Sequence, residues 1–354
     1  MTAAGTYDAG MRFRPNPLAM LPRAVAWLAL AGVVAVCAGT GPTVAGYATL
    51  AAIYVVVGLS LNVILGYTGQ LSLGHQGLVG SGALLAAYTS TAHEAPFVVA
   101  LLFGALAGGI CALVVGFVAL RISGLYLSLV TLVFGVTLQQ SLFQVNALTG
   151  GGAGEPANRP SFLQSDSRFF LVCTALAIGT IYLDFQLTRS KAGRAMLAIK
   201  SDERVAASMG INVVGYKLFA FVLSGLLAGL AGAALAFSSQ QFTGSDYSFN
   251  LAILFVLMTV VGGAGSRAGV IVGSVFFALL GSLLPTLRPF VWFANLFPTQ
   301  TAANIRQFGP GFIGALLLLL TLTFNPGGIA QQIAPVVRWL TGGRFKEANH
   351  ASGA

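Results

Sequence analysis

The chain has 354 residues, of which 56% are hydrophobic and only 8% are charged, and its mean hydropathy is +0.85. This composition excludes an ordinary water-soluble domain and indicates a protein that crosses a membrane several times. The net charge of +9 does not indicate a nucleic-acid-binding protein, because no basic tract is interleaved with aromatic residues. Cys37, Cys111 and Cys173 lie in apolar stretches without metal-ligand spacing, so we expect neither a disulfide framework nor a metal site.

Ten apolar stretches follow one another along the chain. In lipid, a helix satisfies its own backbone hydrogen bonds, and no alternating strand pattern is visible. We therefore predict an all-α, polytopic integral membrane bundle of about ten transmembrane helices. The predicted spans are residues 24–41, 44–66, 77–92, 97–120, 123–146, 168–187, 217–238, 251–264, 269–284 and 308–325.

Three predicted spans are short, since a helix needs about 20 residues to cross ~30 Å of hydrocarbon. They are residues 77–92, 251–264 and 269–284. In transporters, short segments interrupted by glycine often belong to broken or re-entrant helices that line a pathway. Span boundaries misplaced by a few residues would explain the same lengths, so both alternatives stay open.

The basic residues predict the orientation of the bundle, because cytoplasmic loops carry an excess of Lys and Arg. With a cytoplasmic N-terminus, fourteen of the 18 Lys and Arg residues fall inside, and only Arg159, Arg168, Arg288 and Arg306 fall outside. We thus predict a multi-pass membrane protein with both termini in the cytoplasm. Its predicted regions are an N-terminal tail (1–23), helices one to six (24–187), a cytoplasmic loop (188–216), helices seven to ten (217–330) and a C-terminal tail (331–354).

The loop before the seventh span has the densest group of charged residues in the chain. Ser201 is the predicted N-cap of a short helix, and Asp202 and Glu203 lie in its first turn, where the helix dipole favours acidic side chains. Gly210 is expected to end this helix in the left-handed conformation. A solvated connector is the simpler interpretation, but about 30 residues is long where most connections have ~4–6.

A group of uncharged polar residues lies where the second span ends and the third begins. In lipid, buried polar groups are costly when unpaired, so such a group faces either a water-filled path or another helix. Neutral side chains suit a solute that must be released, because a charged partner would retain it. Helix packing would explain these residues equally well. The candidates for a translocation pathway are Asn62, Gln70, Ser72, His75 and Gln76, together with Thr131 on the fifth span.

Several sequence patterns are missing from the chain. It has no G-x-x-x-x-G-K-[ST] motif, so we do not expect it to bind ATP phosphates, and the glycine-rich stretch 262–269 is more typical of a tight turn. We predict no catalytic residues, because neither paired carboxylates nor a His/Cys/Asp cluster is visible. An ion-coupled secondary transporter or channel is the weaker alternative, since Asp184 is the only acidic residue in a predicted span.

Six segments resemble the branched-chain amino acid permeases of ABC transporters, in particular the LivM-like branch. The longest, residues 193–236, reads GRAMLAIKSDERVAASMGINVVGYKLFAFVLSGLLAGLAGAALA. After His75 the chain departs from the family, with Gln76 and Gly77 where small apolar and aromatic residues are common. The other segments are LNVILGYTGQLSLGHQG (61–77), GLYLSLVTLVFG (124–135), LTGGGAG (148–154), VVGGAGSRAGVIVGSVF (260–276) and FNPGGI (324–329).

The resemblance implies a permease subunit of an ATP-driven importer in the bacterial inner membrane, most naturally for branched-chain amino acids, although similar permeases are assigned to urea, amides and other amino acids. It implies no cofactor in this chain, because ATP is hydrolysed by a cytoplasmic ATP-binding subunit. Further implied partners are a second homologous permease, an extracytoplasmic solute-binding protein docked on the outer loops 147–167 and 285–307, and membrane lipid. The residues implied in coupling to the ATPase are Ser201, Asp202, Glu203, Ala206, Ala207 and Gly210, of which the last four stand at positions of an EAA-type loop.

Overall fold

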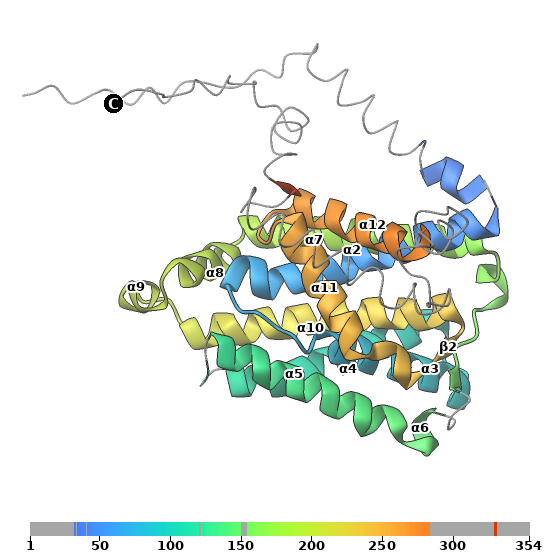
Figure 1. The fold of residues 1–354 in the computed structure, drawn as a ribbon, viewed down its shortest axis with the longest axis horizontal. Coiled ribbons are helices and arrows are strands. Elements are labelled where there is room, and N and C mark those ends of the chain that lie inside the picture. Colours follow the sequence, from blue (N-terminus) through green and yellow to red (C-terminus); the bar gives the residue numbers. More distant parts are fainter. Residues whose placement is uncertain are drawn as a thin grey trace, which may run out of the picture. The chain divides into compact units, whose positions relative to one another are not determined.

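The computed structural model describes residues 41–119, 124–149 and 154–283, together with residues 32, 34–39, 122, 329 and 330. Nearly all of them belong to one compact unit, Cys37–Ile333, which is a bundle of helices (Figure 1). The second unit, Met1–Val36 with Ala334–Ala354, contributes only residues 32 and 34–36. The predicted spans 24–41 and 308–325, the outer loop 285–307 and both predicted tails lie wholly or mostly outside the described residues.

Helices make up most of the described chain, as the composition predicts. Two strands of two residues each, β1 (Glu155–Pro156) and β2 (Gln241–Phe242), pair antiparallel with Glu155 opposite Phe242. The short 3-10 helices are η1 (Leu142–Gln144), η3 (Ser161–Leu163) and η4 (Gly244–Tyr247). The α-helices are α2 (Pro42–Thr68), α3 (His75–Ala92), α4 (Phe97–Ala119), α5 (Leu125–Gln140), α6 (Asn146–Thr149), α7 (Asp166–Arg189), α8 (Lys191–Ser201), α9 (Glu203–Ser208), α10 (Val213–Ser239), α11 (Phe249–Gly262) and α12 (Arg267–Leu283).

Five described segments are long and apolar enough to cross a membrane. α11 and α12 are apolar but shorter, with 14 and 17 residues. The total of ten spans therefore stays a prediction, since two of the predicted spans lie mostly outside the described residues. The five long segments are Pro42–Thr68, Phe97–Val118, Leu125–Gln144, Asp166–Arg189 and Val213–Ser239.

Small residues let α10 approach α3 and α4 closely. A Cβ atom on Gly229 of α10 would collide with the carbonyl oxygen of Gly104, and one on Gly108 with that of Gly225. On α3, a Cβ atom at Gly82 would collide with the backbone of Gly229. Close backbone contact of this kind is how membrane helices pack without large interlocking side chains. α10 is thus held along its length by two neighbouring helices.

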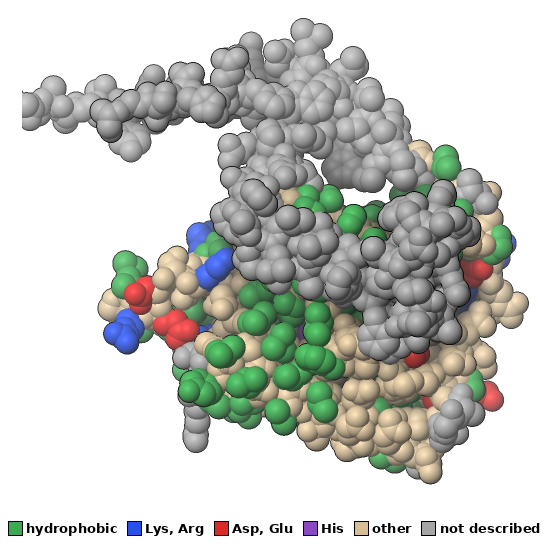
Figure 2. All heavy atoms as spheres, viewed as in Figure 1, with side chains coloured by type: hydrophobic (Ala, Val, Ile, Leu, Met, Phe, Trp, Pro, Cys, Tyr) green, Lys and Arg blue, Asp and Glu red, His purple; other side chains and the backbone are tan. Residues whose placement is uncertain are grey.

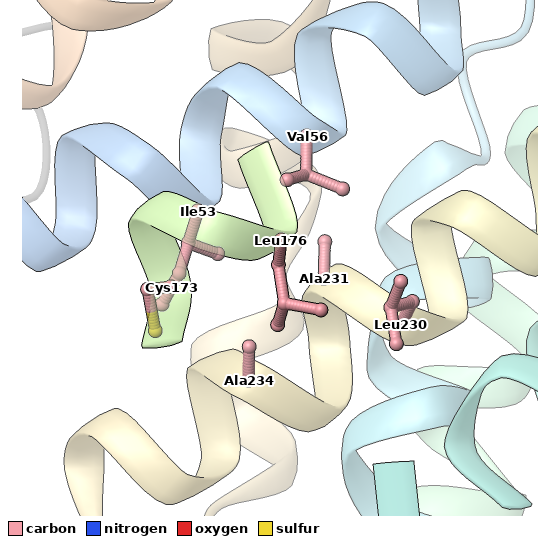
Figure 3. Close-up of a pocket in the computed structure, with 7 residues that line it drawn as sticks. All are labelled: Ile53, Val56, Cys173, Leu176, Leu230, Ala231 and Ala234. Atoms are coloured by element: carbon pink, nitrogen blue, oxygen red, sulfur yellow. The ribbon is translucent and has the colours of Figure 1, made fainter. Parts of the chain in front are cut away.

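The gap between α2, α7 and α10 shows how closely the centre of the bundle is packed. It is too small for a water molecule and is lined by apolar side chains and the thiol of Cys173. Figure 3 shows Ile53 and Val56 of α2 facing Ala231 and Ala234 of α10 across this gap. The Cys173 side chain therefore serves as packing.

Apolar side chains also cover outer surfaces of the bundle. Leu102 and Phe117 of α4 are 58% and 60% exposed, and Leu125 and Tyr126 of α5 are 73% and 75% exposed. Figure 2 shows hydrophobic side chains gathered over α5 and the helices beside it, and charged side chains gathered at the end that carries α8 and α9. An apolar belt with a charged end is what a lipid-embedded helical bundle requires.

The segment between α2 and α3 turns back into the bundle. α2 ends at Gly69 in the left-handed conformation, with φ of 72°, and residues 70–74 form no helix. α3 then begins at His75, whose ring contacts Ser60 of α2. Ser60 lies eight residues before the end of α2, or about 12 Å along the helix axis. α3 thus begins inside the bundle, which favours the re-entrant interpretation of the short third span over misplaced boundaries.

Candidate functional site

Segments distant in sequence meet at the charged end of the bundle. Lys200, near the end of α8, donates a hydrogen bond of 2.8 Å from Nζ to the carbonyl oxygen of Gly66 in α2. Asn62 of α2 accepts a hydrogen bond of 2.8 Å from the backbone N–H of Gly265, in the turn between α11 and α12. The glycine-rich stretch is thus a tight turn, as the sequence predicts, and it lies beside the loop that carries α8 and α9.

A buried ion pair joins α7 to α12 at this end. The Asp184 carboxylate is 1% exposed, and its Oδ2 accepts from Arg267 Nε at 2.5 Å. The Tyr67 hydroxyl donates to the same carboxylate at 2.8 Å, and Arg267 also donates to the hydroxyl of Thr188 at 2.8 Å. Because a buried carboxylate needs such donors, this network gives Asp184 a structural role in the described bundle.

α8 is anchored along one face of the bundle. Ser190 caps its N-terminus by accepting a hydrogen bond of 3.1 Å from Gly193 N. Met196 is fully buried and packs with Val63, Tyr67 and Ala220 of the long helices. α8 is therefore a helix with one apolar, buried side.

The short helix α9 begins one residue later than predicted. Asp202 is its N-cap, with Oδ1 accepting from the backbone N–H of Arg204 at 2.8 Å and of Val205 at 3.1 Å. The prediction that Ser201 caps α9 is wrong, because α8 continues through Ser201. The Ser201 hydroxyl instead donates to the Leu197 carbonyl oxygen. The carboxylate is also favoured at this position by the positive end of the helix dipole.

The other end of α9 is closed as predicted by Gly210, which has φ of 79°. Gly210 N donates to the carbonyl oxygen of Ala207 at 3.0 Å, and Ile211 N donates to that of Ala206 at 3.1 Å. These two bonds form a Schellman motif, which satisfies the last carbonyl groups of a helix. Caps at both ends make α9 a defined two-turn element.

α9 projects from the bundle and exposes apolar side chains. Val205 is 50% exposed and Met209 is 74% exposed, whereas Ala206 is buried. Figure 1 shows α8 and α9 at one end of the bundle, with α9 outermost. The other predicted coupling residues, Ser201, Asp202, Glu203, Ala207 and Gly210, are exposed.

Two open cavities border α9. One, of about 410 Å³, lies beside the end of α2 and is lined by Thr68, Gly69, Gln70, Gly124 and residues 199–204. The other, of about 550 Å³, is lined by Lys191, Arg194, Ala195, Gly210, Ile211, Asn212 and Tyr216. A short helix with exposed apolar side chains between two grooves is suited to contact with another protein.

The sequence interpretation missed an ion pair between α9 and α10. Lys217 Nζ lies 2.5 Å from Glu203 Oε1, and the Lys217 side chain is only 6% exposed. Lys217 is one of the fourteen basic residues that predict the orientation, and the sequence predicts no partner for it. The available signal was its position as the single charged residue of the α10 stretch, because a lysine in such a setting needs a partner.

A polar cluster lies in the interior where α2, α3 and α10 meet. Ser60 Oγ donates to the Ser224 carbonyl oxygen at 2.8 Å, and Ser224 Oγ donates to that of Ser60 at 2.7 Å. His75 Nε2 lies 2.8 Å from Ser60 Oγ. Which of these two atoms donates depends on the tautomer of the ring. Sequence reasoning found His75 but neither serine, since their pairing spans 164 residues.

Several candidate pathway residues have buried polar atoms without a protein partner in the described part of the chain. Gln70 and Gln76 leave both side-chain amide atoms unpaired, and Asn62 Nδ2 and His75 Nδ1 are also unpaired. Ser72 is buried as well. Such atoms are costly unless water or a solute satisfies them.

Thr131 has a different position from these residues. Its hydroxyl accepts from Leu73 N at 3.0 Å and donates to the Ser128 carbonyl oxygen at 2.9 Å. A Cβ atom on Gly74 would collide with the Thr131 carbonyl oxygen. Thr131 therefore holds the returning segment against α5, and its hydroxyl is already paired.

The opposite end of the bundle is fixed by Arg159. Its guanidinium donates to Asp166 at 2.7 Å and to the carbonyl oxygens of Phe237 and Ser238 at the end of α10. In η4, which follows α10 and β2 in the chain, burial raises the pKa of the Asp246 carboxyl. Arg159 and Lys217 thus lie at opposite ends of α10, and their placement on opposite sides of the membrane stays a prediction.

Comparisons with known proteins point to membrane permeases. The family model "Branched-chain amino acid transport system / permease component" matches residues 43–321. The chain is 29% identical over 334 residues to the high-affinity branched-chain amino acid transport system permease protein LivM of Escherichia coli, covering 83% of this chain and 72% of the relative. It is 28% identical over 262 residues to the autoinducer 2 import system permease protein LsrC of an Enterobacter species, and the match covers 71% of this chain and 68% of the relative. The xylose transport system permease protein XylH of Escherichia coli is 37% identical over 114 residues, which cover 32% of this chain and 28% of the relative.

Proposed function

Because the chain belongs to the family of permease components of branched-chain amino acid transport systems, we propose that it forms half of the translocation pathway of an ATP-driven importer. The observation that carries this proposal is α9, a capped helix that projects between two grooves and exposes Val205 and Met209. Its exposed apolar side chains are explained if a further protein covers them. The apolar belt of the bundle supports a place in the bacterial inner membrane.

The partner at α9 is a cytoplasmic ATP-binding subunit. A stiff helix transmits a rigid-body displacement, whereas a flexible connector would absorb it. The caps at Asp202 and Gly210 make α9 stiff, and the contacts of Lys200 and Met196 anchor the preceding helix on the bundle. In this proposal the end that carries α8 and α9 faces the cytoplasm, and ATP is bound and hydrolysed by the partner.

The pathway passes the re-entrant segment at the start of α3. Asn62, Gln70, His75 and Gln76 supply hydrogen-bonding atoms that have no partner within the described chain. All are uncharged amides or a neutral imidazole, so they suit a small zwitterionic or uncharged solute that must be bound weakly and released. Branched-chain amino acids are the proposed solute, because the match to LivM covers more of the chain than the match to LsrC or XylH.

The proposed assembly contains further chains. A second homologous permease would complete the pathway, and an extracytoplasmic binding protein would deliver the solute at the Arg159 end of the bundle. The pairing of Arg159 with Asp166 and with α10 gives that end a fixed shape. The alternative within the same family is a permease for another small polar solute, since the names of LsrC and XylH refer to autoinducer 2 and xylose.

The direct test is purification of the tagged chain from membranes of its native host, followed by reconstitution into proteoliposomes. We expect an ATP-binding subunit and a second permease to co-purify, and ATP together with the binding protein to drive uptake of [14C]leucine. Uptake of xylose or urea in place of leucine would contradict the proposed solute but still support an ATP-driven importer. Transport driven by an ion gradient without any ATPase would contradict the proposal.

A further inference from the structure

Lys217 is the only charged residue of α10, and it is buried. Its Nζ forms the 2.5 Å ion pair with Glu203 Oε1, whereas the Glu203 side chain is 44% exposed. A buried lysine is costly unless it is paired, so the position of Glu203 is tied to that of Lys217. Because Glu203 is the first residue of α9, the pair joins the start of the short helix to the first turns of α10.

α9 has few other contacts that could fix it to α10. Ala206 is its buried side chain, while Val205 and Met209 face outward. α8 is anchored separately, through Lys200 and the Gly66 carbonyl oxygen. Within the described chain, the ion pair is therefore the direct polar link between α9 and α10.

α10 leads from this link to the polar cluster in the interior. Ser224 lies seven residues beyond Lys217, or about 10 Å along the helix. Its hydroxyl donates to the Ser60 carbonyl oxygen, and Ser60 contacts His75 at the start of α3. The close glycine contacts with α3 and α4 leave α10 little freedom to bend, so a displacement of its first turns reaches Ser224 as a rigid-body movement.

We propose that Lys217 is a positioning residue for coupling, which through Glu203 makes α9 and α10 move as one body. The inference rests on the proposed function and adds the residue that carries motion from the ATPase contact to the Ser60, Ser224 and His75 cluster. In this arrangement Glu203 acts on the chain's own α10. Because Glu203 is paired with Lys217, the contact with the ATPase is made by the exposed apolar side chains of Val205 and Met209.

The informative variant is Lys217→Met, which keeps the length and packing of the side chain and removes the charge. Glu203→Gln leaves a buried lysine unpaired and should lower stability more than Lys217→Met does. The exchanged pair, Glu203→Lys with Lys217→Glu, tests direct contact. Arg189→Gln is the matched control, because Arg189 is exposed at the end of α7, lines neither groove beside α9 and makes no ion pair in the described part of the chain.

The first measurement uses the purified complex in proteoliposomes. Lys217→Met should retain the ATP-binding subunit and its ATP hydrolysis, while the ATP consumed per imported [14C]leucine rises roughly tenfold. The exchanged pair should recover most of the native ratio, and Arg189→Gln should equal the native chain. A native ratio in Lys217→Met, with the complex intact, would overturn the inference and leave the proposed function standing.

The second measurement does not depend on the solute. Spin labels at Ser208 and Ser239, in a chain whose three cysteines are replaced by alanine, report the distance between α9 and the far end of α10. We expect one narrow distance distribution, unchanged by ATP and vanadate, and a broad one in Lys217→Met. Equal distributions in the two chains would refute the link. Failure of the native chain to retain any ATPase would instead refute the proposed function, and the spin labels alone would then decide on the link.

Discussion

The Tyr67 hydroxyl reaches both oxygens of the Asp184 carboxylate, at 2.8 and 3.0 Å, across 117 residues of sequence. Arg267 completes the network from α12, so one buried carboxylate joins α2, α7 and α12. This network stabilises the end of the bundle on which α8 rests. Asp184 is the single acidic residue of the predicted spans, and this network explains its presence, so that no role in ion coupling is needed.

Removal of one member of this network should be costly. Arg267→Met leaves the buried Asp184 carboxylate without its cation, so we expect a loss of about 3–5 kcal/mol in the free energy of unfolding. The double variant with Asp184→Asn should be more stable than Arg267→Met alone. Thermal unfolding in detergent measures the difference, with the exposed Arg168→Gln as control. Equal stability of Arg267→Met and the native chain would show that the carboxylate is solvated.

Gly210→Ala should distort the end of α9. A residue with a side chain in the left-handed region costs roughly 1–2 kcal/mol, and Gly210 has φ of 79°. We expect intact membrane insertion but weaker binding of the ATP-binding subunit and less uptake per ATP hydrolysed. Gly179→Ala is the matched control, because a Cβ atom there meets nothing within 4 Å. Native binding of the ATP-binding subunit and native uptake in Gly210→Ala would show that coupling does not depend on the shape of α9.

Gly229→Ala should destabilise the packing of α10. Its Cβ atom would meet the backbone of Gly104 and Gly108, and overpacking of this kind costs about 1–3 kcal/mol. The thermal midpoint of the purified chain should fall, whereas Gly46→Ala, with open space around it, should leave the midpoint unchanged. An unchanged midpoint in Gly229→Ala would mean that α4 and α10 separate readily.

Gln76→Leu separates the two interpretations of the polar group. Both amide atoms of Gln76 are buried and unpaired, so an apolar replacement removes a desolvation cost and should not lower the thermal midpoint. If the side chain lines the pathway, leucine uptake should fall roughly tenfold, which corresponds to the loss of one good hydrogen bond. Native uptake with a lowered midpoint would instead assign Gln76 to helix packing.

The sequence predicts those features that depend on local chemistry. The apolar stretches predict the long helices, Gly210 predicts the end of α9, and the polar residues from Asn62 to Gln76 predict a buried polar group. The N-cap at Asp202 was missed by one residue, because both Ser201 and Asp202 are good caps and only the continuation of α8 decides between them.

Features that depend on tertiary pairing could not be predicted. Ser60 and Ser224 are ordinary small residues in apolar stretches, and only the crossing of α2 and α10 brings their hydroxyl groups together. The link between Glu203 and Lys217 needs the exact turn between α9 and α10, which a charge pattern does not specify. The return of the chain after Gly69 is indicated only by the short length of the third span.

The central claim, that a separate ATPase binds α9, is tested most directly by photo-crosslinking. A benzoylphenylalanine introduced in place of Met209, which is 74% exposed, should form a covalent adduct with the ATP-binding subunit in native membranes. The same group in place of Phe162, which is 60% exposed near Arg159 at the opposite end, should form none. An adduct from Phe162, or its absence from Met209 while the complex is intact, would contradict the account.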